Sequence, residues 1–459
     1  MFMSMGVVSL VVWLALLFLS ITEGIERMWQ DKLTALHAPI RITPTQDYYN
    51  SYYYLVDSIS SESGYSYKSI EEKRLSPLSN PYLQDIDVQP PPYWTPPDLD
   101  SQGQLRDPVK TAYALLEKMQ KKYEHLTFQS YEAGAGLLKL QLKKQRQGLT
   151  QACYFASMPD KNPKLESLII PPSRAPIKLQ EILLPKSFQD SGASVGDQGH
   201  ITYNALTPNG MQEQFIPISI AGFYDPGILS VGIRCALVHP SIARTINTNG
   251  NSLPVDKTLG NGIHVWPQDL NSVKKLTQDL KSAFEAEHIA SYWEITPFYA
   301  YEHARELVQQ FQSDKYLFTL VATAILLVAC CNIISLLILL VNDKKKEIAI
   351  LQTLGASQLS IATIFALCGS ILGILSASLG AIAAFFTLKH IDICIGWISS
   401  LYGQELFSST FYGPSLPSTL SASATLFVMV TTPILALFAA VIPALKACTL
   451  KPAPLLRSE

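Results

Sequence analysis

The chain has 459 residues, 48% of them hydrophobic, and its 35 basic and 37 acidic residues leave a formal net charge of −2. This length indicates several structural units rather than one, and the near-neutral balance gives no reason to expect a nucleic-acid partner. Hydrophobicity is uneven: residues 25–315 are mixed and polar, as in an ordinary soluble domain, whereas both ends are strongly apolar.

Four apolar runs are long enough to cross a bilayer, which requires about 20 apolar residues. They are Met5–Thr22, Tyr316–Val341, about Ile361–Leu388 and about Thr419–Ile442. The predicted fold class is therefore a membrane protein with four transmembrane α-helices and a large α+β extracytoplasmic domain between the first and second spans. We expect the first transmembrane helix within residues 1–24, the second at 316–341, the third at 361–388 and the fourth at 419–443.

The first apolar run has an alternative interpretation, a cleaved signal peptide. No basic residue precedes the run, and the sequence that ends it, Ser20-Ile-Thr-Glu-Gly, lacks an A-x-A-like cleavage site. These two features favour a retained span. Both alternatives leave the large domain outside the cytoplasm.

Residues 25–315 combine helical and strand patterns. A helix is predicted at about Pro108–Tyr123, because Asp107 can cap it and Pro108 suits its first position. A second amphipathic helix is predicted at about Leu270–His288. Strand-like segments are Leu137–Leu142, Ala152–Phe155, Gly199–Ala205 and Phe215–Ala221.

Within this domain, residues 46–106 form an irregular insertion rich in Tyr, Ser and Pro, and its prolines favour an extended path. A partly ordered surface loop is favoured over an aromatic binding site. The domain also holds two cysteines, Cys153 and Cys235. They can pair in an oxidising compartment or remain two buried free thiols, and the sequence leaves both alternatives open.

A short charged and then amphipathic segment, Asn342–Ser357, lies between the second and third spans. Its three lysines place it in the cytoplasm, so that residues 389–418 are outside and residues 444–459 form a cytoplasmic tail. Apolar residues return at helical spacing after the charges, Gly355 is placed to end a helix in a left-handed cap, and Ser357 can begin the next one. This is more than a plain solvated turn requires, and a docking role is favoured.

Motifs for catalysis are missing from the sequence. It contains no G-x-x-x-x-G-K-[ST] nucleotide loop, no G-x-S-x-G, no H-E-x-x-H and no paired C-x-x-C, and its eight histidines are scattered. The predicted spans contain no Asp, Glu, Lys or Arg that would suggest a proton or ion path. We therefore expect no catalytic, cofactor-binding or metal-binding residues, no enzymatic activity in this chain, and an energy source elsewhere.

With these residues in view, the chain resembles the permease subunits of the lipoprotein-releasing ABC transporter, the LolC/LolE type within the MacB/FtsX group. The segment NDKKKEIAILQTLGAS is similar to that family's charged, E-I-A-I-L and T-x-G-A-S pattern. The chain's end is similar to the family's P-A-x-x-A…P-x-x-x-L-R-x-E ending, through Ile442-Pro-Ala-Leu-Lys-Ala and Leu450-Lys-Pro-Ala-Pro-Leu-Leu-Arg-Ser-Glu. Ile182-Leu-Leu-Pro-Lys and Ile220-Ala-Gly-Phe-Tyr-Asp-Pro-Gly are similar to strand and turn patterns of its exported domain.

The resemblance implies a multi-pass permease of the bacterial inner membrane with a MacB-like periplasmic domain. It works as a homo- or heterodimer with a second permease subunit and a separate LolD-type ABC ATPase. Membrane lipoproteins are the cargo, released toward the outer membrane through mechanical coupling, and a periplasmic carrier is a further partner. The implied ATPase contacts of this coupling helix, residues 342–360, are Lys344, Lys345, Lys346, Glu347, Ile348, Ile350, Leu351, Leu354 and Gly355.

Two alternatives within the same group remain. One is a MacB-like exporter of small molecules or peptides, although MacB carries a fused ATPase that this chain lacks. The other is an FtsX-like signalling protein that controls a cell-wall hydrolase and transports nothing. The chain departs from the family pattern at residues 46–106. It also departs at its start, because the first residue lies almost inside the first span. A natural N-terminus longer than the given sequence is therefore a further alternative.

Overall fold

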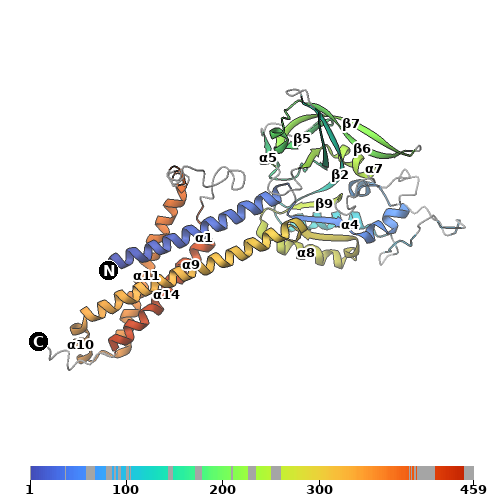
Figure 1. Cartoon of the computed structure of the whole chain (residues 1–459). Helices are drawn as coiled ribbons and strands as arrows, with labels where there is room; N and C mark the ends of the chain where they lie inside the picture. The colour runs from blue at the N-terminus through green and yellow to red at the C-terminus, as the bar shows by residue number, and fades with distance from the viewer. Residues whose placement is uncertain are drawn as a thin grey trace. The chain divides into compact units, whose positions relative to one another are not determined.

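The computed structural model describes residues 2–36, 38–57, 68–78, 85–86, 89–90, 95–99, 103, 105–142, 148–170, 178–207, 210–225, 234–249, 260–391, 393, 395–396, 400 and 419–448. The chain divides into two compact units (Figure 1). One, the helical unit, comprises Met1–Gln30 and Leu307–Glu459, and the other, the β-rich unit, comprises Asp31–Glu306.

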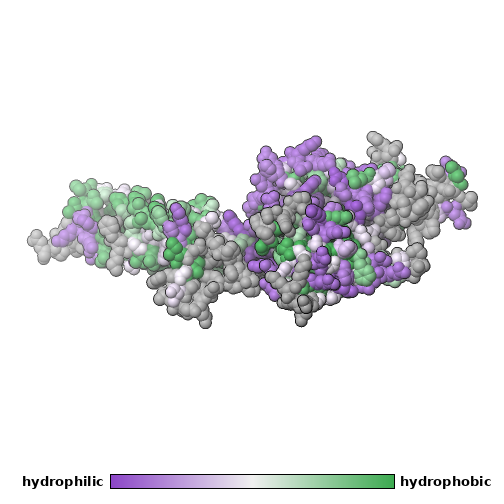
Figure 2. Space-filling view, turned by 90° about the horizontal axis from the view of Figure 1, so that it is seen from above, coloured by the Kyte–Doolittle hydropathy of each residue, from purple (hydrophilic) through white to green (hydrophobic). Residues whose placement is uncertain are grey.

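Long apolar helices make up the helical unit. They are α1 (Phe2–Leu36), α9 (Glu302–Asp343), α11 (Gln358–Lys389) and α14 (Ala422–Cys448), with the short α10 (Lys345–Thr353) between α9 and α11. All four long helices are long and apolar enough to cross a membrane, by length and composition. Figure 2 shows hydrophobic side chains gathered along the helices and mostly hydrophilic ones over the β-rich unit. The four predicted apolar helices are therefore present, in a membrane protein.

Two of these helices extend well beyond their apolar runs. The helix α1 continues for fourteen residues past Thr22 to Leu36, and α9 begins fourteen residues before Tyr316, at Glu302. The charged residues that end an apolar run are themselves good helix formers. Pairs spaced i, i+4, such as Glu23 and Arg27 with 2.6 Å between carboxylate and guanidinium, support a helix in water. The end of the apolar run therefore does not mark the end of the helix.

The helices α11 and α14 approach each other closely at two glycines. A Cβ atom added to Gly369 would lie 2.7 Å from the Cβ of Ala440, and one added to Gly373 would lie 2.8 Å from the Cβ of Ala436. Small residues spaced by four allow helix backbones in a membrane to pack closely. An apolar core that α9, α10, α11 and α14 share also includes Leu337, Ile348 and Phe365.

A ten-stranded sheet, counted over the described residues, organises the β-rich unit in the order β10-β1-β9-β2-β3-β8-β5-β7-β4, with β6 pairing β2 and β7. The strands are β1 (Ile40–Pro44), β2 (Thr127–Gln141), β3 (Gly148–Ser157), β4 (Ile169–Ile170), β5 (Glu181–Pro185), β6 (Gln198–Thr207), β7 (Gly210–Tyr224), β8 (Cys235–Val238), β9 (Asn261–Trp266) and β10 (Trp293–Pro297). The four predicted strand segments are confirmed in β2, β3, β6 and β7, although β2 ends at Gln141, one residue before the predicted end at Leu142.

The long strand β2 belongs to both halves of this sheet. Its residues 127–132 pair with β9, and residues 133–141 pair with β3. One half, around β1, β9 and β10, lies with α4 (Pro108–Lys122) and α8 (Val273–Ala286), and α7 (Pro240–Asn249) packs on β2 and β3 in the other half. The helix α4 begins as predicted, because the Asp107 side chain accepts hydrogen bonds from the backbone N–H groups of Val109 and Lys110 at 3.0 and 2.9 Å. A turn of 3₁₀-helix, Leu270–Ser272, precedes α8.

Both cysteines of the β-rich unit are buried free thiols. Cys153 lies in the apolar core that includes Phe155 and Ile246, whereas Cys235 lies in a separate core with Leu237 and Tyr224. Burial raises the pKa of the Cys153 thiol to about 12 and that of Cys235 to about 11. Of the two alternatives left open by the sequence, the structure has the free thiols, and both are kept protonated.

Part of the 46–106 insertion is buried and part lies on the surface, where Leu75, Ile86 and Leu99 are 77%, 75% and 55% exposed. It forms α2 (Gln46–Tyr49), a π-helix (Tyr52–Val56) and α3 (Ile70–Leu75). Tyr48, Tyr52 and Tyr53 are each 1% exposed, and the Tyr48 ring stacks on the Trp293 ring of β10 at 5.8 Å. Residues 58–67, 79–84, 87–88 and 91–94, which include Tyr93 and Trp94, lie outside the described residues.

An ion pair also holds this insertion in place. Lys73 of α3 pairs with Asp57, and their side chains are 4% and 3% exposed. Burial lowers the pKa of Lys73, and the nearby Asp57 carboxylate opposes that shift. Charged side chains are found at such depth only when they are paired. The prediction of a surface loop therefore fails for the buried tyrosines and for this ion pair, and it holds for the exposed residues 85–86, 89–90 and 98–99.

Candidate functional site

The segment between α9 and α11 forms a short capped helix, here called the elbow (residues 342–357). Its helix α10 ends where the backbone N–H groups of Leu354 and Ala356 donate to the carbonyls of Ile350 and Leu351, and Gly355 adopts φ +95°. An added Cβ at Gly355 would meet no atom within 4 Å, so the backbone conformation and not crowding favours glycine. The Ser357 hydroxyl accepts a hydrogen bond from the Ser360 N–H at 3.1 Å and begins α11. Both predicted caps are confirmed.

The apolar side chains of the elbow do not lie on one face. Ile348 is 5% exposed and packs into the core of the helical unit, together with the fully buried Ala349. Ile350, Leu351 and Leu354 are 47%, 46% and 79% exposed. Among the predicted contact residues, Ile348 therefore anchors α10 to the helices, while the other three, here called the apolar triad, face outward.

The basic residues of the elbow are largely unpaired. Lys344 Nζ lies 2.5 Å from a Glu347 carboxylate oxygen, and both side chains are more than half exposed. An exposed pair of this kind contributes about 0–1 kcal/mol. Lys345 and Lys346 have no acidic partner within the part of the chain that the structure describes. The elbow thus presents positive charge beside the apolar triad.

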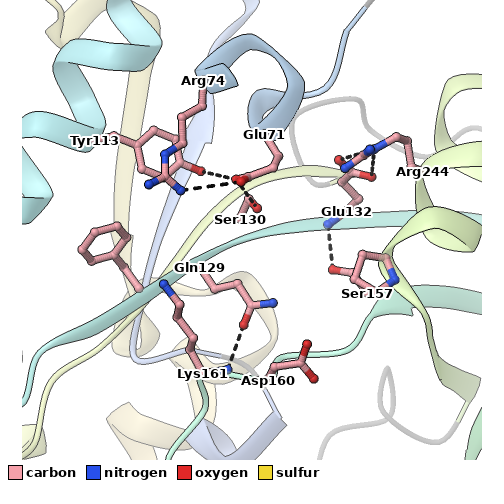
Figure 3. Close-up of a pocket in the computed structure, with 12 residues that line it drawn as sticks. Glu71, Arg74, Tyr113, Gln129, Ser130, Glu132, Ser157, Asp160, Lys161 and Arg244 are labelled. Atoms are coloured by element: carbon pink, nitrogen blue, oxygen red, sulfur yellow. Dashed lines mark hydrogen bonds and ion pairs between the residues drawn. The ribbon is translucent and has the colours of Figure 1, made fainter. Parts of the chain in front are cut away.

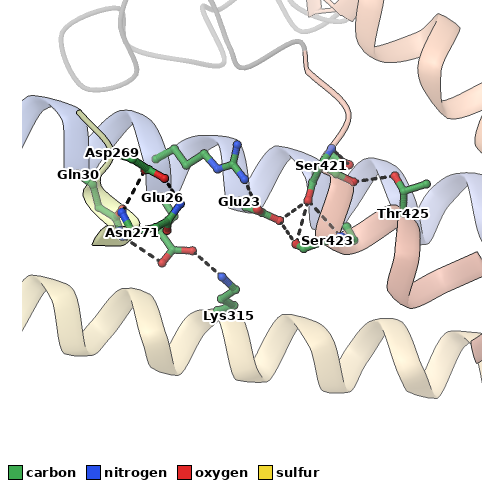
Figure 4. A network of polar contacts seen from close by, with 12 residues as sticks. Glu23, Glu26, Gln30, Asp269, Asn271, Lys315, Ser421, Ser423 and Thr425 are labelled. Atoms are coloured by element: carbon green, nitrogen blue, oxygen red, sulfur yellow. Dashed lines mark hydrogen bonds and ion pairs between the residues drawn. The ribbon is translucent and has the colours of Figure 1, made fainter. Parts of the chain in front are cut away.

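A second polar feature joins α1 to the beginning of α14 (Figure 4). The Glu23 carboxylate accepts hydrogen bonds from the hydroxyls of Ser421 and Ser423, the latter at 2.6 Å, and from Arg27 at 2.6 Å. The Ser421 N–H donates to the Ser20 hydroxyl at 3.3 Å. A carboxylate is favoured at a helix N-terminus, where backbone N–H groups give a partial positive charge. Glu23 therefore ties the first apolar helix to the last.

One turn further along, α1 also contacts α9. Lys315 Nζ lies 3.1 Å from a Glu26 carboxylate oxygen, as Figure 4 shows. An aromatic contact lies on either side of this ion pair along the helices. The ring centres of Trp29 and Phe311 are 5.2 Å apart on one side, and those of Phe18 and Phe318 are 4.8 Å apart on the other. The two long helices thus lie side by side where their apolar runs give way to charge. We call this set of contacts, together with those of Glu23, the polar seam.

The sequence analysis did not predict the polar seam, because Glu23 and Glu26 lie just beyond the first apolar run and nothing near them in the chain indicates a partner. Ser421 is 398 positions from Glu23, and Lys315 is 289 positions from Glu26. The one available signal was the presence of two carboxylates a turn apart at the end of an apolar run. Among the described residues, no group of three or more His, Cys, Asp or Glu side chains is placed to hold a metal ion.

The elbow and its flanking helices lie in a part of the chain that matches a known family. Residues 319–452 match the FtsX-like permease C-terminal family. This FtsX-like region contains α10, α11 and α14 and most of α9. The chain is also similar to lipoprotein-releasing system transmembrane proteins of the LolC and LolE type.

Three such relatives show the extent of the similarity. LolC of Xylella fastidiosa is 22% identical over 272 residues, 58% of this chain and 62% of that protein. In Haemophilus influenzae, LolE is 36% identical over 133 residues and LolC 34% over 155, about a third of each chain. The chain thus spans less than two thirds of the length of the relatives it matches. The predicted resemblance to this group of permeases is confirmed.

Proposed function

We propose that this chain is the permease subunit of an ABC transporter that uses a separate ATPase to extract lipoproteins from the inner membrane and release them toward the outer membrane. ATP hydrolysis belongs to a LolD-type subunit, and the permease works as a dimer with a second, similar or identical permease chain. A periplasmic carrier receives the cargo. No catalytic step is assigned to this chain.

The observation that carries the proposal is the elbow inside the FtsX-like region. A nine-residue helix with a left-handed Gly355 at its end presents Ile350, Leu351 and Leu354 outward beside Lys345 and Lys346, which have no ion pair among the residues that the structure describes. Exposed apolar residues gathered with charge are typical of a protein–protein contact. The ATPase contacts we assign are Lys344, Lys345, Lys346, Glu347, Ile350, Leu351 and Leu354, with Gly355 setting the end of the helix and Ile348 holding it from behind.

The proposed topology follows from the lysines of the elbow. With residues 342–360 in the cytoplasm, residues 25–315 and 389–418 lie in the periplasm and residues 444–459 return to the cytoplasm. The spans are then 1–24, 316–341, 361–388 and 419–443. The helices α1 and α9 continue along the chain from the spans into the β-rich unit.

Mechanical coupling is the mechanism that this arrangement supports. Closure of the ATPase pair would displace α10, and Ile348 packs in the same apolar core as α9 and α11, so those helices would move with it. The polar seam joins α9 to α1 through Lys315 and Glu26. A switch between two discrete arrangements of the packed helices would then drive the release of cargo, without an open pore.

Co-purification separates this function from its alternatives. The full chain, isolated in mild detergent from its own organism, is expected to bring down an ABC ATPase together with lipoproteins. A cell-wall hydrolase in their place would indicate the FtsX-like signalling protein, and a periplasmic efflux duct would indicate the MacB-like exporter. The lipoprotein-releasing function is favoured because the 272-residue LolC similarity is longer than the FtsX-like region and takes in part of the β-rich unit.

A further inference from the structure

A cavity of about 280 Å³ lies within the β-rich unit where β2 passes from one half of the sheet to the other (Figure 3). Its walls come from α3, α4, β2, α7, the end of β3 and the segment after β3. Small-molecule sites of proteins typically measure about 300–1,000 Å³ and favour junctions between lobes. A water molecule takes about 30 Å³ of liquid volume. The cavity therefore suits a ligand of few heavy atoms.

Two of the carboxylates in the cavity wall are already occupied. Glu71 accepts hydrogen bonds from the hydroxyls of Ser130 and Tyr113 at 2.8 and 3.4 Å. Glu132 is 3% exposed, and Arg244 Nε lies 3.3 Å from both of its oxygens. Burial raises the pKa of Glu132, and Arg244 opposes that shift. These acids hold the wall together and are not available to a ligand.

Two adjacent charges at the cavity are different. Within the described chain, neither the Asp160 carboxylate nor Lys161 Nζ has an ion pair or a side-chain hydrogen bond. Lys161 Nζ instead lies 5.5 Å from the centre of the Phe128 ring. Figure 3 shows its ammonium on the side of Gln129 that faces Arg74 and Tyr113, and the Asp160 carboxylate on the opposite side.

The segment that bears these charges is fixed by β2. Gln129 accepts a hydrogen bond from the Lys161 N–H at 2.9 Å through its Oε1 and donates from Nε2 to the Met158 carbonyl at 3.1 Å. Both ends of the amide are used, so the backbone on either side of Asp160 is held against the sheet. A positive and a negative charge are therefore presented at set positions, with the Tyr113 and Phe128 rings between α4 and β2 as an apolar wall.

We propose that this cavity binds a compact zwitterion, whose anionic group lies toward Lys161 and whose ammonium pairs with Asp160. Arg74 in the same wall already has partners, since its guanidinium forms ion pairs with Glu71 at 3.6 Å and Glu117 at 3.9 Å and lies over the Tyr113 ring at 4.5 Å. A free amino acid and the phosphoethanolamine head group of a lipid share this chemistry. The site is separate from the elbow and does not depend on the proposed transport function.

Ligand-detected NMR titrations of the full chain in detergent test the proposal. The probes are glycerophosphoethanolamine and L-alanine as zwitterions, with glycerol phosphate and ethanolamine as carriers of one charge each. At least one zwitterion is expected to bind at least tenfold more tightly than either single-charge probe. Tighter binding of glycerophosphoethanolamine would identify a lipid head group, and tighter binding of L-alanine a free amino acid.

Variants assign the binding to the cavity. Lys161→Met and Asp160→Asn should each weaken the preferred zwitterion about tenfold or more, and both side chains are exposed, so the melting temperature should stay unchanged. Lys274→Met is the matched control, since Lys274 is an exposed lysine on α8 away from the cavity. The proposal would be overturned if no zwitterion bound, if glycerol phosphate bound as tightly as the zwitterions, or if both cavity variants bound the preferred zwitterion as tightly as the unaltered chain.

Discussion

Replacement of Leu354 by serine tests whether the apolar triad of the elbow is a docking surface. Leu354 is 79% exposed, so serine at this position removes little packing within the chain. Full burial of a leucine side chain contributes about 1.5–3 kcal/mol, and covering the exposed part of Leu354 with a partner therefore contributes roughly 1–2 kcal/mol. That free energy corresponds to a roughly five- to thirtyfold weaker affinity for the ATPase in the variant.

The assay is a titration of the immobilised permease, in detergent, with the ABC ATPase that co-purifies with it, followed by ATP-dependent lipoprotein release from vesicles. Ile348→Val is the matched control on the opposite side of the same helix, where the side chain is 5% exposed. Removing one buried methylene costs about 0.5–1.5 kcal/mol of stability. The control should lower the melting temperature and leave the affinity unchanged, and Leu354→Ser should show the reverse pattern.

An affinity and a release rate equal to those of the unaltered chain in Leu354→Ser would refute the assignment of the triad as a contact. A lower melting temperature in Leu354→Ser would instead show that its side chain packs within this chain. Either result would remove the observation on which the proposed coupling rests.

Three further perturbations address other contacts. Charge reversal by Lys345→Glu with Glu347→Lys should lower lipoprotein release from reconstituted vesicles while membrane insertion survives; normal release would contradict the role of the elbow. Glu23→Ala removes a charged hydrogen-bond acceptor worth about 1.5–3 kcal/mol and should lower the melting temperature more than Glu23→Gln does, whereas equal temperatures would argue against the polar seam. Lys73→Met leaves Asp57 buried without a partner and should cost about 3–5 kcal/mol in denaturant unfolding; adding Asp57→Asn should recover most of that loss, and no recovery would contradict the pairing.

Features that depend on neighbours in the chain could be predicted from the sequence. The four apolar helices follow from run length, because a bilayer requires a fixed number of apolar residues. The caps at Asp107, Gly355 and Ser357 follow from local backbone chemistry, in which a side chain or a left-handed glycine satisfies groups within four residues. These elements needed no knowledge of what packs against them.

Features that depend on distant partners could not be predicted. The tyrosines at 48, 52 and 53 look like residues of a loop until Trp293 and the neighbouring sheet cover them. Glu23 looks like the end of a span until Ser421 meets it. Such contacts leave no pattern in a single sequence, because the residues next to one partner along the chain carry no information about the distant partner.

The elbow shows both kinds of determination in one short helix. Its existence, its charge and its ends were set by the sequence, through lysines that follow an apolar run and a glycine that can adopt positive φ. Only the tertiary structure decided that Ile348 lies inward and Leu354 outward. Helical spacing in the sequence shows which apolar residues share a face of the helix. Which face is buried depends on where the neighbouring helices pack.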